Sequence, residues 1–307
     1  MTGEYDSNMI IVIVTVKETT EYFSCTWLLI IECFILGTMS FFQLITFGCF
    51  LLVAALSQFY FSLYHKVNGT VEKPARDCSE IWTRNKNSSS GIYTILPNGA
   101  KRTFKVFCEI SEKGGWTLIQ KHKGDNGLSF DKTWKYYEKG FGNLKGEHWL
   151  GLKYMYLLTQ QKRRPAKLHI SIGDLAGYEA YAEYNPFSIG NASKFYRLSA
   201  GTYSGTAGDA FAGNIGIPGS SQRGSNFSAP DKPNDGCHPQ CIFGDIAYIS
   251  CSGCYRAAWW FNACGSANLN GEWRRPPQNQ RRALSVSWPT WKPHESLKFS
   301  AMYLIHE

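Results

Sequence analysis

The chain has 307 residues, of which 44% are hydrophobic and 15% aromatic, enough for one large globular domain and an additional N-terminal segment. Its formal net charge is +8, and its basic residues are scattered apart from short clusters at 162–164 and 281–282. Such clusters suit a solvated surface, or a contact with acidic glycans or acidic protein surfaces. The sequence has no nucleic-acid-binding motif, no Gly-x-Ser-x-Gly turn and no His-Glu-x-x-His pair, so we expect neither a nucleic-acid partner nor an enzyme.

The first segment to interpret is the uncharged run 40–64, whose part 41–56 is apolar enough to cross a membrane. Either it is the core of a secretion signal that is cut after Ala55-Leu56-Ser57, where small residues have the required spacing, or it is an uncut single-pass anchor. Basic residues follow the run, and for an uncut helix they would leave the C-terminal part in the cytosol. Cytosolic placement fits badly with the cysteines described below.

We therefore expect a secretion signal over 1–57. Met39 directly precedes the apolar core, so residues 1–38 would be an extension from an upstream start. A short linker then covers 58–77, and a secreted, extracellular domain covers 78–307.

The domain opens with a small unit over 78–113, in which 105–110 is strand-like and Asn98-Gly99 marks a turn between extended runs. The main body covers 114–200. Its residue patterns predict strands at 115–119, 168–172 and 178–184, and a short helix at 152–161. From Gly201 onward Gly, Ser, Asn and Pro dominate, which predicts a loop-rich region that disulfides hold together.

Ten cysteines are present, three of them in or before the apolar run. The seven that remain are Cys78, Cys108, Cys237, Cys241, Cys251, Cys254 and Cys264. In an oxidising compartment these should mostly pair, and an odd number leaves either one thiol or a bridge to another chain, which would make a disulfide-linked dimer. The spacings Cys237-x3-Cys241 and Cys251-x2-Cys254 also mimic a four-thiolate zinc site, but in a secreted chain we favour disulfides.

Four Asn-x-Ser/Thr triplets agree with passage through the secretory pathway, although each one alone is a weak signal. Their acceptor residues, which we expect to carry glycans, are Asn68, Asn87, Asn191 and Asn226.

Several blocks of the sequence are distinctive and stand in a fixed order. They include Cys78-Ser79-Glu80-Ile81-Trp82, Gly114-Gly115-Trp116-Thr117-Leu118 and Tyr203-Ser204-Gly205-Thr206-Ala207, and near the C-terminus Trp259-Trp260-Phe261-Asn262-Ala263-Cys264. Together they resemble the fibrinogen-related (fibrinogen C-terminal) domain over residues 78–307. The resemblance implies an α+β fold, with a mixed or antiparallel sheet, short helices and a loop-rich, disulfide-stapled C-terminal subdomain.

The resemblance also implies two disulfides. One joins Cys78 to Cys108. The other joins Cys264 to an earlier cysteine, for which Cys241 and Cys251 qualify by different counts. We favour Cys251, which lies 13 residues before Cys264, and we infer about ten extra residues between Cys241 and Trp259.

A calcium loop is implied at 227–235, with Asp231 and Asp235 as carboxylates and the carbonyls of Cys237 and Pro239 completing the shell. Pro233 stands where the family has its first carboxylate, and calcium prefers more than one. We therefore expect calcium to bind weakly or not at all.

The resemblance places a ligand pocket beside this loop, with a cis peptide bond between Ala263 and Cys264. The residues implied as its lining are Trp260, Asn262, Ala263, Cys264, Gly265, Asn268, Trp273 and Trp288. Gly265 stands where lectin members of the family often have a histidine, so we expect simple N-acetylated sugars to bind poorly. Provided that the bond between Ala263 and Cys264 is cis, we expect Gly265→His to strengthen their binding. Burial in the core is the alternative for the tryptophans.

Two functions remain open. The form Cys-Gly-x-x-Asn-Leu-Asn-Gly is similar to that of angiopoietins, and it favours a secreted protein that binds an extracellular receptor or matrix protein. The alternative is a calcium-assisted lectin that recognises acetylated sugars in innate defence.

Overall fold

A computed structural model describes residues 52–60, 62, 72–124, 127–213, 220–237, 240–243, 246–273, 285–293 and 295–306. The chain divides into two units, Met1–Glu72 and Lys73–Glu307. In the first unit, residues 52–60 are helical. Most of the expected signal segment 1–57 lies outside the described residues, and none of the helices described is long and apolar enough to cross a membrane.

The second unit begins with helix α3 (Cys78–Arg84), whose first turn is capped by the Asp77 carboxylate, which accepts a hydrogen bond from the backbone nitrogen of Glu80 at 2.9 Å. Strands β1 (Gly91–Ile95) and β2 (Phe104–Ser111) follow as an antiparallel pair. A disulfide between Cys78 and Cys108 ties α3 to β2, which is the pairing that the resemblance implied.

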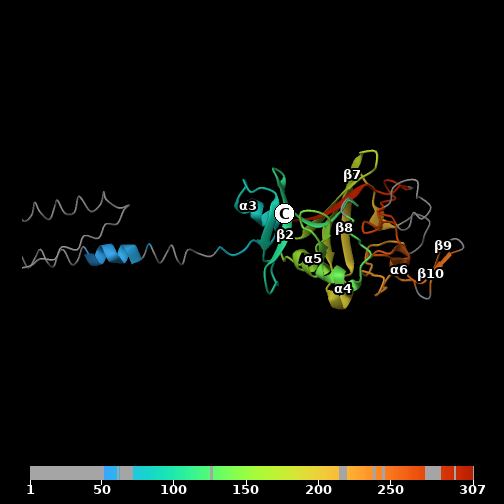
Figure 1. Ribbon diagram of the computed structural model, residues 1–307, viewed down its shortest axis with the longest axis horizontal. Helices are drawn as coiled ribbons and strands as arrows, with labels where there is room; N and C mark the ends of the chain where they lie inside the picture. The colour runs from blue at the N-terminus through green and yellow to red at the C-terminus, as the bar shows by residue number, and fades with distance from the viewer. Residues whose placement is uncertain are drawn as a thin grey trace, which may run out of the picture. The chain divides into compact units, whose positions relative to one another are not determined.

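One antiparallel sheet organises this unit, with the strand order β1-β2-β3-β11-β6-β7-β8 (Figure 1). The strands that continue it are β3 (Gly114–His122), β6 (Ala166–Gly173), β7 (Glu179–Ile189), β8 (Leu198–Gly205) and β11 (Phe299–His306). The last strand of the chain, β11, pairs with both β3 and β6, so the C-terminal residues lie in the middle of the sheet. The α+β fold with an antiparallel sheet is thereby confirmed.

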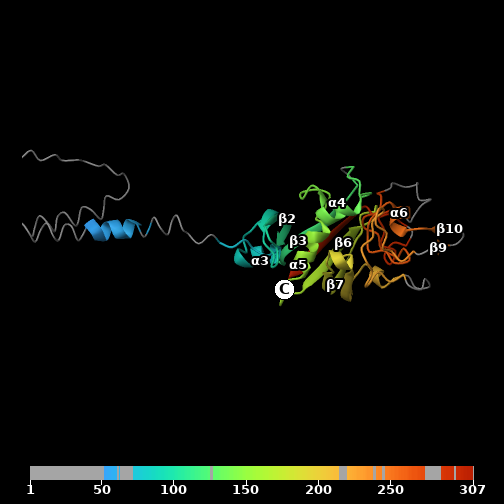
Figure 2. The same cartoon turned by 90° about the horizontal axis from the view of Figure 1, so that it is seen from below.

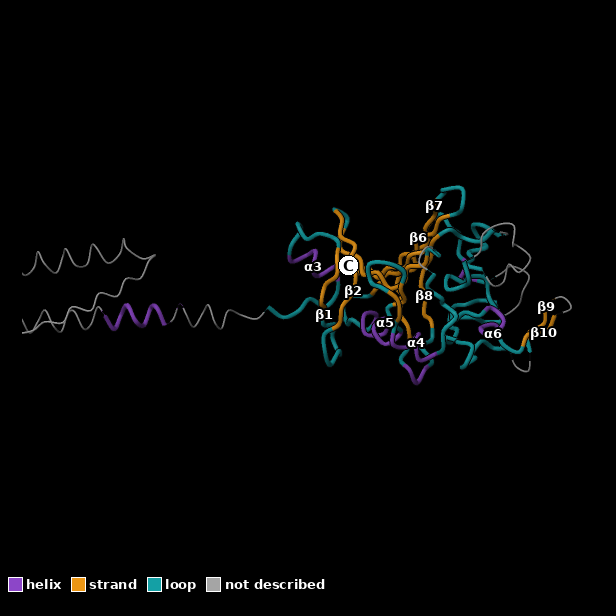
Figure 3. The backbone as a smooth tube through the Cα atoms, viewed as in Figure 1, coloured by secondary structure: helices purple, strands orange, loops and turns teal. Residues whose placement is uncertain are grey.

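Short elements complete the unit and lead into the loop-rich part, which Figure 3 shows beyond β8. They are α4 (Trp134–Lys139), β4 (Phe141–Gly142), β5 (His148–Trp149), α5 (Leu152–Thr159), η1 (Ala192–Lys194), η2 (Ala210–Ala212), β9 (Cys241–Phe243), β10 (Ile246–Tyr248) and α6 (Cys251–Tyr255). Of these, β5 pairs with β3 and β4 with β5, so both belong to the same sheet. The strands β9 and β10 form a separate hairpin, which stands at the end of the unit opposite α3 in both Figure 1 and Figure 2.

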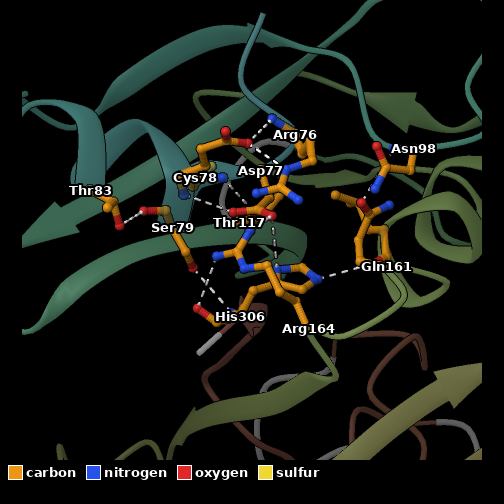
Figure 4. A network of polar contacts seen from close by, with 12 residues as sticks. Arg76, Asp77, Cys78, Ser79, Thr83, Asn98, Thr117, Gln161, Arg164 and His306 are labelled. Atoms are coloured by element: carbon orange, nitrogen blue, oxygen red, sulfur yellow. Dashed lines mark hydrogen bonds and ion pairs between the residues drawn. The ribbon is translucent and has the colours of Figure 1, made fainter.

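A buried polar network fixes the C-terminal end of β11 against α3 (Figure 4). The Asp77 carboxylate, fully buried, pairs with the Arg164 guanidinium at 2.8 Å and lies 3.7 Å from Nδ1 of His306. His306 donates from Nε2 to the carbonyl of Leu158 at 2.9 Å. Because a buried ion pair is costly to break, this network ties three distant segments of the chain together.

Candidate ligand-binding region

Two of the three tryptophans expected to line a pocket, Trp260 and Trp288, belong to the core, as does their neighbour Trp259. Trp259, Trp260 and Trp288 are each 0% exposed. The indole nitrogen of Trp260 donates to the carbonyl of Tyr196 at 2.8 Å, and that of Trp288 donates to the carbonyl of Gly208 at 3.0 Å. The expectation that Trp260 and Trp288 form pocket walls is therefore wrong, because their rings fill the space between the sheet and the loop-rich part. Trp273 is half-buried and packs over Gly124, whose hydrogen faces the indole ring.

The peptide bond between Ala263 and Cys264 is trans, so the expected cis bond is wrong. Instead, three successive residues have left-handed backbones, with φ of 42° at Ala263, 66° at Cys264 and 63° at Gly265. Such a run reverses the chain direction within a few residues, although L-residues pay a steric penalty for it. The backbone thus makes the sharp turn of the loop without an isomerised bond.

Gly265 is held against the side chain of Gln222. A Cβ atom at Gly265 would lie 2.5 Å from Nε2 of Gln222, which is closer than such atoms approach. The buried amide of Gln222 in turn donates to the carbonyl of Ala267 at 2.9 Å and accepts from its backbone nitrogen at 3.2 Å. The bond between Ala263 and Cys264 is not cis, and a histidine at 265 would displace the amide that organises the loop, so the geometry gives no support to a gain of sugar binding by Gly265→His. Sequence reasoning missed Gln222, which no motif marks.

Asn262 and Asn268, also expected at the pocket, are placed differently. Asn262 is half-buried and donates from Nδ2 to the carbonyl of Ser221 at 2.9 Å. Asn268 is only 3% exposed, and its backbone pairs with that of Ser287. Among the residues described, the expected lining therefore does not surround one open pocket.

The carboxylate of Asp235, expected to hold calcium, is already surrounded by hydrogen-bond donors. It is 3% exposed, and its Oδ2 accepts from the hydroxyl of Ser228 and from both the backbone nitrogen and the hydroxyl of Ser252, each at 3.1 Å. Ser252 belongs to α6 and directly follows Cys251. These neutral donors stabilise the buried carboxylate by hydrogen bonds to one of its two oxygens.

The other expected calcium ligands do not complete a site. Asp231 is exposed and its Oδ1 accepts from the backbone nitrogen of Trp134 at 2.7 Å, which anchors its loop to α4. Pro239 lies outside the described residues. Within those residues, the one group of three or more metal-binding side chains is made of cysteines, not carboxylates. Calcium prefers six to eight oxygen ligands, and the described part of this loop brings no second carboxylate to Asp235, so the expectation of weak calcium binding stays a prediction.

Those cysteines form two adjacent disulfides, Cys237–Cys241 and Cys251–Cys264, and the second is the pair favoured from the sequence. The sulfur atoms of Cys237 and Cys251 lie 3.2 Å apart. All four cysteines are thus used as disulfides rather than as zinc thiolates. Cys254, on α6, stands outside the three disulfides of the domain.

The hairpin β9–β10 occupies the inferred insertion, directly after the Cys237–Cys241 bridge. Ile242 pairs in register with Ala247, so both side chains project from the same face. Ile242 is 66% exposed, Ala247 is exposed, and Ile249 just beyond β10 is 82% exposed. A stapled hairpin with exposed isoleucines is the feature of this region best suited to contact another molecule.

Of the expected glycan acceptors, Asn87 and Asn191 are exposed, and Asn226 is half-buried. Asn68 lies outside the described residues. Ser228 of the fourth sequon, that of Asn226, is fully buried in the folded chain, where it donates to Asp235.

Comparison with known proteins agrees with this architecture. Human angiopoietin-1 is 38% identical over 235 residues, which cover 76% of this chain and 43% of that protein. Human fibrinogen-like protein 1 is 38% identical over 221 residues, which cover 70% of this chain and 66% of that protein. This chain therefore spans less than half the length of the angiopoietins that it matches.

Solved structures share the fold. The fibrinogen-like globe domain of human ANGPTL2 superposes with a TM-score of 0.64 at 32% identity, over 76% of this chain and 99% of that one. A lamprey fibrin D-dimer, complexed with the peptide Gly-His-Arg-Pro-amide, gives a TM-score of 0.66 at 26% identity, over 93% of this chain and 94% of that one. The family model of the fibrinogen beta and gamma chains, C-terminal globular domain, matches residues 74–307, and the chain belongs to that family.

Proposed function

We propose that this chain is a secreted, non-enzymatic ligand that binds an extracellular receptor or matrix protein, and that the hairpin β9–β10 supplies the contact. The observation that carries the proposal is the exposure of Ile242 and Ile249 on an element that projects from the globe. Exposed apolar side chains that lie together mark sites of protein contact more often than isolated ones do. The similarity to angiopoietins and to fibrinogen-like protein 1 supports the class of function.

The hairpin is also held in a fixed conformation before it meets a partner. The disulfide Cys237–Cys241 ties the first residue of β9 to the preceding loop. Helix α6 follows the hairpin, with the ring of Tyr255 packed edge-on to that of Phe261 at 5.2 Å. Fixing a binding loop in advance lowers the entropy lost on association. The contact is therefore made by a short rigid element rather than by a concave sugar pocket, and the relatives reported above give no support to the lectin alternative.

The experiment compares the full chain with two variants in binding to cells that display a library of receptor and matrix proteins. Ile242→Asp with Ile249→Asp places charges on the hairpin. The matched control is Ile92→Asp with Leu175→Asp, at residues that are 39% and 41% exposed elsewhere on the unit. We expect the hairpin variant to lose more than about fivefold in affinity for the partner found, which corresponds to about 1 kcal/mol, and the control to keep it.

Two outcomes would contradict the proposal. One is equal loss of affinity in both variants. The other is tight binding to an N-acetylglucosamine resin that the hairpin variant retains, because the lectin function would then account for recognition.

A further inference from the structure

Two turns that are distant in the sequence meet at the end of the domain near α3 (Figure 4). One is the β1–β2 turn, and the other follows α5. The backbone nitrogen of Asn98 in the first donates to Oε1 of Gln161 in the second, at 3.3 Å. Gln161 is 4% exposed, and its Nε2 donates to the carbonyl of Leu157 at 2.7 Å, so its amide fixes both turns to the end of α5.

Each turn carries a pair of exposed basic residues directly beside this junction. Lys101 and Arg102 are exposed in the first turn, and Lys162 and Arg163 in the second. We call these four residues the basic patch. In the part of the chain that the structure describes, none of the four forms an ion pair (the bridges present involve other residues).

The carboxylates that α3 brings to this end are already paired with other cations. Asp77 pairs with Arg164 at 2.8 Å, and Glu80 pairs with Arg76 at 2.8 Å and with Arg84 at 3.0 Å. Hydrogen bonds from both arginines lower the pKa of Glu80 to about 2 although its partial burial opposes this, so Glu80 stays ionised and committed to them. The positive charge of the basic patch is thus left uncompensated by these neighbours.

We propose that the basic patch binds an extended sulfated polysaccharide. Four exposed cations on adjacent turns offer charge and hydrogen-bond donors at a surface that a linear polyanion can follow. The residues exposed beside the basic patch are Asn98 and Gly99, whereas the apolar Pro97 is buried within the fold. The patch therefore has no exposed aromatic or aliphatic side chain that could form the apolar centre typical of protein interfaces. A purely electrostatic contact favours a polyanion over a folded protein partner.

The location of the basic patch separates it from the proposed receptor contact. The patch lies beside Asp77 and α3, whereas the hairpin β9–β10 stands at the opposite end of the same unit (Figures 1 and 2). A polysaccharide on the patch would therefore retain the protein at a matrix or cell surface and leave the hairpin accessible. This inference does not depend on the hairpin being the receptor contact.

The test measures binding of the full chain to immobilised heparin as a function of salt. The patch variant carries Lys101→Gln, Arg102→Gln, Lys162→Gln and Arg163→Gln. The control variant removes the same charge at four other exposed lysines, with Lys113→Gln, Lys135→Gln, Lys139→Gln and Lys194→Gln. All eight side chains are exposed, so both variants should keep the melting temperature of the parent chain, which is measured first.

By the counterion-release relation known for nucleic acids, four contacts predict a slope of about −3 for the logarithm of affinity against that of salt concentration. We expect the parent chain and the control to show this slope, and the patch variant to lose most of it together with at least about tenfold in affinity at ~0.15 M salt. Equal loss in patch and control variants, or no binding by the parent at that salt, would overturn the proposal.

Three further probes identify the occupant. Chemically desulfated heparin should bind much more weakly than heparin, and vesicles of phosphatidylserine and phosphatidylcholine should bind no more tightly to the parent than to the patch variant. If the vesicles bind through the patch more tightly than heparin does, an acidic membrane surface is the occupant and the polysaccharide proposal is wrong. If polyaspartate binds through the patch as tightly as heparin does, an acidic protein segment is the occupant and the polysaccharide proposal is wrong.

Discussion

The carboxylate of Asp235 and the first turn of α6 meet at Ser252, which offers both its backbone nitrogen and its hydroxyl to Oδ2 of Asp235, each at 3.1 Å. Asp235 lies in the loop where the family resemblance implied calcium, and Ser252 directly follows Cys251, which is bonded to Cys264. Together with the hydroxyl of Ser228, Ser252 thus supplies the hydrogen-bond donors that stabilise this buried carboxylate.

Ser252→Ala should therefore destabilise the domain. A hydrogen bond from a hydroxyl to a buried carboxylate contributes about 1.5–3 kcal/mol, so we expect a melting temperature lower by roughly 3–12 °C for a domain of this size. Ser199→Ala, at an exposed position of β8, is the control and should change little. An unchanged melting temperature for Ser252→Ala would show that Asp235 does not need this donor.

Calcium should have little effect on stability. A tight site at 100-fold excess of ion would contribute about 2.7 kcal/mol, and we expect far less because Asp235 is already satisfied and Pro233 offers no carboxylate. The measurement is the melting temperature with millimolar calcium and with a chelator. Pro233→Asp adds a carboxylate, and any calcium-dependent shift should then increase. A rise of many degrees in the parent chain would contradict the hydrogen-bonded arrangement.

Substitution of Gly265 should reveal the contact with Gln222. Gly265 has φ of +63° and Gly127 has φ of +65°, but a Cβ at Gly265 meets Gln222 at 2.5 Å whereas one at Gly127 meets nothing within 4 Å. Gly127→Ala therefore reports the backbone penalty alone, about 1–2 kcal/mol, and Gly265→Ala should cost more. Urea unfolding of both variants measures the difference. Equal losses would mean that Gln222 moves aside freely.

The sequence predicts those elements whose side chains alternate or recur with a clear period. The strand expected at 105–110 is β2, that at 168–172 is β6, and the helix expected at 152–161 is α5. The central strand β11 was not predicted, because most of its side chains are buried on both faces and its apolar run has no alternation. Nothing else in the sequence of residues 299–306 indicated that this strand lies at the centre of the sheet.

The site was predicted less well than the fold, for a physical reason. The sequence pattern of an aromatic residue near a cysteine is the same whether the aromatic ring lines a pocket or fills the core. The ring of Trp260 fills the core. The left-handed backbone at Ala263 and Cys264 has no sequence signal, since neither residue type favours positive φ. The spacing of Cys251 and Cys264, by contrast, did carry information, because the loop between them has a fixed length.

The N-terminal prediction stands to be tested directly. We expect the secreted chain to begin near Gln58, because the apolar run ends in Ala55-Leu56-Ser57 with small residues at the required spacing. Intact-mass measurement of the medium protein, after enzymatic removal of any glycans, gives the first residue. Recovery of the full-length chain in the membrane fraction would contradict this prediction.

Stability should decrease as the pH falls from 7.5 to 5.5. Burial lowers the pKa of His306 below its ordinary 6.5, since the nearby Asp77 offsets this only in part, and burial likewise lowers the pKa of His148. Between the lowered values and 6.5 the unfolded chain binds protons that the folded chain does not, so the free energy of unfolding rises with pH in that window. Glu147 does not contribute there: its burial is outweighed by hydrogen bonds from His122 and the backbone, which lower its pKa to about 2.

Urea unfolding at the two pH values measures the effect, which for each histidine is at most about 1.4 kcal/mol per pH unit. His306→Gln can still donate to the carbonyl of Leu158 but cannot be protonated, so it should reduce the pH dependence, and adding His148→Gln should nearly remove it. A parent chain that is equally stable at pH 5.5 and 7.5 would show that His306 accepts a proton without disturbing Asp77 and Arg164, and that the buried network tolerates an additional positive charge.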